Sequence, residues 1–137
     1  MELQEIFDVA AHHLMSMNGP SLDGDACVYR GKDDDCEFNG QKCAVGLFIK
    51  DEHYDDGLEG SIVSSRGDDV SLALAKSMGQ RLLTRGQLML FSDLQEAHDN
   101  IHHTHTGRWP IEIVKALLAV ASRHHLCFSQ GGNDNGI

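Results

Sequence analysis

The sequence predicts an α+β fold, consisting of a single, mostly helical domain with about four helices and a small β-hairpin. Four segments place apolar side chains at the three- and four-residue spacing of one helical face. Two short runs with β-branched or aromatic residues flank an acidic loop, as in a hairpin. The chain has 137 residues, a length at which one core buries roughly two-thirds of the unfolded surface. We therefore expect one domain over residues 1–128 and a flexible polar tail over residues 129–137.

The predicted helices cover residues 2–17, 70–83, 88–99 and 110–124. The second helix has Asp68 or Asp69 as its N-cap, and Gly86 ends it. Within the third, Ser92 to Gln95 has the Ser-x-x-Gln form of a capping box, so the helix has a second potential start at Ser92. Pro110 suits the first position of the fourth helix.

The expected hairpin consists of two short strands, Cys27 to Arg30 and Cys36 to Phe38, joined by an acidic loop. Residues 42–49 form a short apolar run, and their periodicity does not separate helix from strand. We favour a short helix there. The hairpin and this segment should pack across one end of the helices.

The charge balance excludes some classes of partner. The chain has 21 acidic residues against 11 lysines and arginines, a formal net charge of −10. This balance argues against binding nucleic acid or an anionic membrane directly. No apolar run approaches the ~18 residues of a membrane-spanning helix. The N-terminus does not have the pattern of a signal peptide, so we expect a cytoplasmic protein with reduced cysteines.

Most of the acid lies between residues 23 and 69, where 13 of the carboxylates occur. Such a surface can attract a protein partner with a basic surface, as in DNA-mimicking inhibitors. The alternative is that the charge serves solubility alone. The candidate partner-binding residues are Asp33, Asp34, Asp35, Glu37, Asp51, Glu52, Asp55 and Asp56.

A histidine cluster is the other candidate site. His98, His102 and His105 could hold zinc if the third helix continued far enough to bring His98 and His102 to one face. The cluster lacks the glutamate of the His-Glu-x-x-His motif, and the alternative is a solvated loop that binds metal adventitiously. A second set, the cysteines before residue 44 with His53, lacks the close cysteine pair of structural zinc sites. We therefore expect no cofactor, with zinc as the alternative.

Short blocks spread over most of the chain carry a resemblance. Residues 40–54 include Lys-Cys-Ala-Val-Gly-x-x-Ile-x-Asp-Glu-His-Tyr, and Phe91 to Gln95 and Trp109-Pro110 follow. These blocks resemble an uncharacterised family of small phage, prophage and bacterial proteins. This chain has Lys50 where such proteins often have proline, and His125 where they have glycine.

The resemblance implies a context, a mobile element and a host cytoplasm, and it implies no activity. Together with the charge, it favours a small acidic non-enzymatic protein that binds another macromolecule. A phage- or mobile-element-encoded inhibitor of a host defence or nucleic-acid-handling protein fits this description. The alternative is a small metal-binding protein or metal-dependent enzyme that uses the cluster from His98 to His105.

Overall fold

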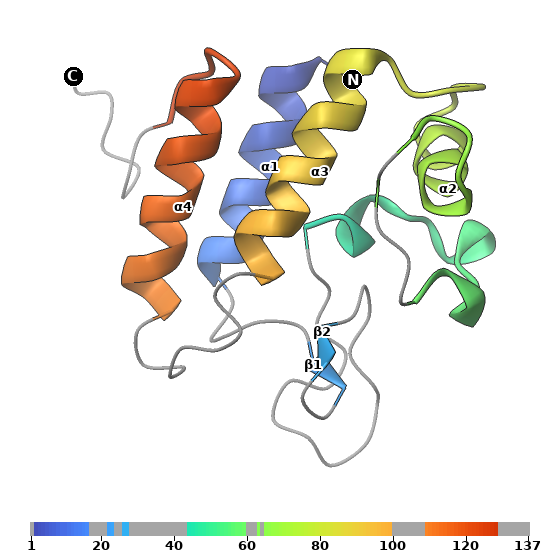
Figure 1. The fold of residues 1–137 in the computed structure, drawn as a ribbon, viewed down its shortest axis with the longest axis horizontal. Helices are drawn as coiled ribbons and strands as arrows, with labels where there is room; N and C mark the ends of the chain where they lie inside the picture. The colour runs from blue at the N-terminus through green and yellow to red at the C-terminus, as the bar shows by residue number, and fades with distance from the viewer. Residues whose placement is uncertain are drawn as a thin grey trace.

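The computed structural model describes residues 2–16, 22–23, 26–27, 44–59, 63, 65–99 and 109–128. Three helices, α1 (Leu3–Ser16), α3 (Arg85–Asp99) and α4 (Trp109–Arg123), each contact the other two and form a bundle. A shorter helix, α2 (Asp69–Ser77), lies on the side of α3 away from α4 (Figure 1). These four helices correspond to the four that the sequence predicts.

The bundle forms because each long helix has one apolar face that must leave water. Burying a large aliphatic or aromatic side chain contributes about 1.5–3 kcal/mol. Phe48, from the segment before α2, meets Phe91 edge to face at a centroid distance of 5.3 Å. The large side chains of the three helices that are fully buried are Ile6, Phe7, Leu14, Leu90, Phe91, Leu94, Ile113 and Leu117.

The predicted α+β class is wrong. The described residues are mostly helical, and their only extended pairing joins two residues, β1 (Leu22–Asp23), to two more, β2 (Ala26–Cys27). Two residues per strand do not form a sheet face that could cover a core. Cys27 pairs backwards with Leu22 instead of starting a strand that pairs forwards. The other expected strand, Cys36 to Phe38, lies outside the described residues.

Helix α2 begins where the sequence indicates and ends early. Its N-cap is Asp68, one of the two expected residues, whose carboxylate accepts a hydrogen bond from a backbone N–H of the first turn. The helix ends at Ser77 instead of residue 83. Gly79 takes a left-handed conformation (φ 76°), and the Gln80 N–H donates back to a carbonyl of the last turn at 2.7 Å. This is a Schellman motif, which glycine favours because it has no Cβ.

Helix α3 begins three residues before its predicted start and runs without interruption. The Thr84 hydroxyl accepts from the Gln87 N–H at 3.1 Å, and the Gln87 side-chain oxygen accepts from the Thr84 N–H at 2.9 Å. These reciprocal bonds are a capping box. Gly86, expected to end the second helix, lies in the first turn of α3, and no restart occurs at Ser92.

After α4 the chain turns back onto α1. His125 occupies the left-handed position of a second Schellman motif, with φ 57°. The backbone of Cys127 then both donates to and accepts from the Gln4 side-chain amide, at 3.0 and 2.9 Å. Phe128 packs edge to face on Phe7. These contacts tie the segment after α4 to the first turns of α1.

Residues 44–59 form three single 3-10 turns, η1 (Gly46–Phe48), η2 (Asp51–His53) and η3 (Asp56–Leu58). The short helix expected in residues 42–49 is thus one 3-10 turn, with residues 42 and 43 outside the described part. The segment lies against α2, where the Lys50 N–H donates to the Ser77 hydroxyl at 2.9 Å. The expected tail, residues 129–137, is also outside the description.

Candidate functional site

The acidic segment, residues 51–59, follows the buried end of the apolar run. Ile49 is buried and Lys50 is extended (φ −67°, ψ 151°), which turns the chain outwards. One 3-10 turn closes next, with the His53 N–H donating to the Lys50 carbonyl at 2.9 Å. The carboxylates of the first turn thus lie at the positive end of a short helix, where negative charge is favoured.

The segment divides its side chains between the core and water. Leu58 is buried, and Tyr54 is partly buried and donates its hydroxyl proton to Glu59. Asp51, Glu52 and Asp55 are exposed, and the Glu52 side chain retains 74% of its accessible surface. The inward side chains and the Lys50 to Ser77 hydrogen bond anchor the segment, which presents three carboxylates to solvent.

The structure brings together only part of the predicted acidic surface. Asp51, Glu52 and Asp55 lie within five consecutive residues and are all exposed. Asp56 lies in η3, and its side chain is not among those described. The remaining predicted residues, Asp33, Asp34, Asp35 and Glu37, are outside the described part of the chain. A single patch that combines both groups stays a prediction.

The histidine cluster is described only at its first member. His98 lies in the last turn of α3 and is fully buried. His102 and His105 are outside the described residues. Over the ranges that the structure describes, no group of three histidine, cysteine or acidic side chains is arranged to hold a metal ion. Cys127 is exposed and has a free thiol, and the side chains of the other cysteines are not described.

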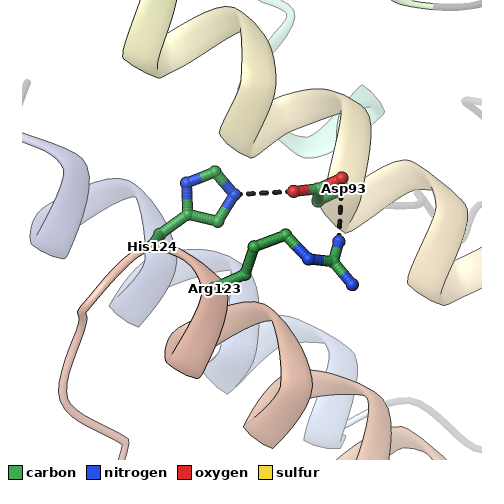
Figure 2. Close-up of polar contacts among 3 residues, drawn as sticks. All are labelled: Asp93, Arg123 and His124. Atoms are coloured by element: carbon green, nitrogen blue, oxygen red, sulfur yellow. Dashed lines mark hydrogen bonds and ion pairs between the residues drawn. The ribbon is translucent and has the colours of Figure 1, made fainter.

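A polar contact that sequence reasoning missed joins α3 to the end of α4 (Figure 2). One Asp93 carboxylate oxygen lies 2.7 Å from His124 Nε2, and the other lies 3.1 Å from the Arg123 guanidinium. His124 and Asp93 are largely enclosed, with 9% and 17% of their side-chain surfaces exposed, whereas Arg123 is 55% exposed.

These three side chains join α3 to the last turn of α4. A histidine oriented by a carboxylate serves catalysis when a nucleophile stands at its other ring nitrogen. Among the described side chains, His124 makes its hydrogen bond to Asp93 alone. His124 and Arg123 instead contact both oxygens of Asp93 and hold the last turn of α4 against α3. His124 faces inwards, while the neighbouring His125 is exposed.

None of the helices in the described ranges combines the length and the apolarity needed to cross a bilayer. No family model, no curated protein and no solved structure matches the chain.

Proposed function

We propose that the protein is a non-enzymatic binding protein whose acidic segment, residues 51–59, docks on the basic surface of a protein partner. The observation that carries the proposal is the exposure of Asp51, Glu52 and Asp55 on a segment anchored by buried side chains. An anchored backbone reduces the conformational entropy that the segment loses on binding. The net charge of −10 adds long-range attraction for a cationic surface.

The wider role that we propose follows from the same chemistry. A host protein that handles nucleic acid presents cationic surface to phosphates, and clustered carboxylates compete for that surface. The resemblance of residues 40–54 to proteins of phages and prophages supports an inhibitor that acts in the host cytoplasm.

The test is a charge reversal with a matched control. The partner is captured from a lysate of the source cell, identified by mass spectrometry and purified. Its association rate is then measured for wild type, for Glu52→Lys/Asp55→Lys, and for Glu5→Lys/Asp8→Lys. Both double variants replace two exposed acids and change the net charge equally.

We expect the Glu52/Asp55 variant to associate roughly tenfold more slowly at low salt, because rim charges act mainly on the association rate. The difference should shrink as salt rises from about 0.1 M to 1 M and the Debye length falls from ~10 Å to ~3 Å. The Glu5/Asp8 variant should lie close to wild type. Equal rates for the two double variants would contradict docking through the acidic segment.

A metal measurement separates this proposal from the metal-dependent alternative. Elemental analysis of tag-free protein should find no stoichiometric zinc, nickel or iron. One equivalent that is lost in His102→Ala/His105→Ala, and retained in His12→Ala/His13→Ala, would instead favour a site in the histidine cluster.

A further inference from the structure

A groove of about 240 Å³ lies between α3 and α4, away from the acidic segment. Its floor is apolar, because Ala97 and Val120 line it and are 8% and 3% exposed. Ala119 on α4 forms part of its open side. Alanines at these positions leave space between the helices that larger side chains would fill.

The two carboxylates along this groove differ in whether they have partners. At one end, His124 and Arg123 occupy both oxygens of Asp93. Glu96 is three residues further along α3 on the same face, is exposed and also lines the groove. Within the described residues, no ion pair or hydrogen bond engages the Glu96 carboxylate. Among the residues that the structure describes, the groove therefore combines an apolar floor with one carboxylate that has no charged partner.

We propose that this groove binds a basic segment of a protein partner. An aliphatic side chain of that segment rests on the floor formed by Ala97 and Val120, and a neighbouring lysine or arginine pairs with Glu96. The apolar contact releases water from the floor. The charged groups that line the groove, Asp93, Glu96 and Arg123, sum to −1, so they favour a cation over an anion.

The charge of the whole chain selects between occupants. A second copy of this protein would bring another −10, and the two copies would repel each other. A basic segment is attracted instead. The groove is also a separate surface from the acidic segment, because α4 and α2 lie on opposite sides of α3 (Figure 1). The groove is thus a second contact surface, and binding there does not depend on binding at the acidic segment.

The experiment is a selection of displayed random peptides on the wild-type protein, with counter-selection on Ala119→Trp. Ala119 is exposed, so tryptophan can fill the groove without entering the core. The matched control is Ser122→Trp, an exposed position on the same helix that does not line the groove. Thermal melts of both variants report whether the fold is retained.

We expect the selected peptides to carry a lysine or arginine close to an aliphatic residue. Measured by fluorescence anisotropy, their dissociation constants should rise by about tenfold or more on Ala119→Trp and stay within about twofold on Ser122→Trp. Glu96→Gln should weaken binding by about threefold, the scale of an exposed ion pair, and Glu96→Lys by about tenfold.

Three outcomes would overturn the proposal. The first is a selection that yields no peptide preferring wild type over Ala119→Trp, and the second is a set of peptides without basic residues. The third is a loss of binding on Glu52→Lys with none on Glu96→Lys, which would move the binding site to the acidic segment. That third result would contradict binding in the groove and would agree with the proposed function.

Discussion

Helix α3 is packed in two different ways on its two sides. On one side, α1 and α4 meet it helix on helix through large buried side chains such as Leu14 and Leu117. On the other side lie α2 and the three 3-10 turns of residues 44–59. On that side, backbone N–H groups also donate to side chains, from Lys50 to Ser77 and from Val63 to Gln95.

This difference indicates which part of the molecule is more stable and which part presents exposed charge. Apolar burial holds the bundle of α1, α3 and α4, and its free energy scales with the area removed from water. The flank, defined as residues 44–59 with α2, combines fewer large buried side chains with bonds worth about 1 kcal/mol each. We expect the flank to open locally at lower free energy than the bundle. It is also the side that presents the acidic segment.

The largest expected effects compare the two sides directly. Leu14→Ala and Leu117→Ala should each cost about 2–5 kcal/mol, because both side chains are fully buried in the bundle. Leu58→Ala, on the flank and 6% exposed, should lie at the lower end of that range. Urea unfolding measures the three free-energy costs, provided that the m-value of each variant equals that of wild type. A cost at Leu58 equal to that at Leu117 would contradict the comparison.

The next effect concerns the bond that anchors the acidic segment. Ser77→Ala should cost about 1–2 kcal/mol, because the partly buried Lys50 N–H loses its acceptor. Hydrogen exchange at the Lys50 amide should accelerate more than exchange in α4. The control is Ser122→Ala, an exposed serine on α4, which should change stability by less than about 0.5 kcal/mol. Equal behaviour of the two variants would show that the hydroxyl of Ser77 does not anchor the segment.

The residues that end α2 and α4 extend the comparison of the two sides, because substitutions at these two ends should change stability in opposite directions. Gly79→Ala should destabilise the protein by about 1 kcal/mol, because a Cβ is unfavourable at φ 76°. His125→Gly should stabilise it by up to about 1 kcal/mol, since His125 holds φ 57° with a side chain. Thermal melting of both variants gives the signs. A loss of stability in His125→Gly would show that the His125 side chain contributes contacts that outweigh its backbone strain.

The smallest effect is expected at the acidic segment. Lysine at positions 51, 52 and 55 together should change the free energy of unfolding by less than about 0.5 kcal/mol per site, because all three side chains are exposed. Denaturant unfolding at low salt checks this. A larger loss would mean that the carboxylates hold the 3-10 turns together, and slower partner binding would then reflect altered structure.

The bundle could be predicted from the sequence because periodicity reports helices that bury one face. The bounds of α1 and α4 lie within one residue of those predicted. The end of α2 was missed because Leu82 continued the apolar spacing past Gly79. In the structure, Leu82 is 39% exposed and its neighbour Leu83 is buried from a non-helical stretch. The glycine at position 79, which has a positive φ in the structure, was the sequence signal for this helix end.

The candidate sites also differ in whether the sequence could predict them. The exposure of Asp51, Glu52 and Asp55 could be predicted because ionised carboxylates avoid the core. The contact between Asp93 and His124 could not, since these residues are 31 positions apart and meet only once α3 and α4 are packed. The groove beside them depends on the same packing, so neither periodicity nor residue spacing indicated it.

The hydrogen bonds between Gln4 and Cys127 bear on the order of events in folding. They join residues 123 positions apart, so forming them closes a loop that includes nearly the whole described chain. The entropic contribution to the free-energy cost of closing a loop rises by about 0.6 kcal/mol for each doubling of its length. We expect this contact to form after the helices have docked and to be absent from the transition state. Its loss would then raise the unfolding rate and leave the folding rate unchanged.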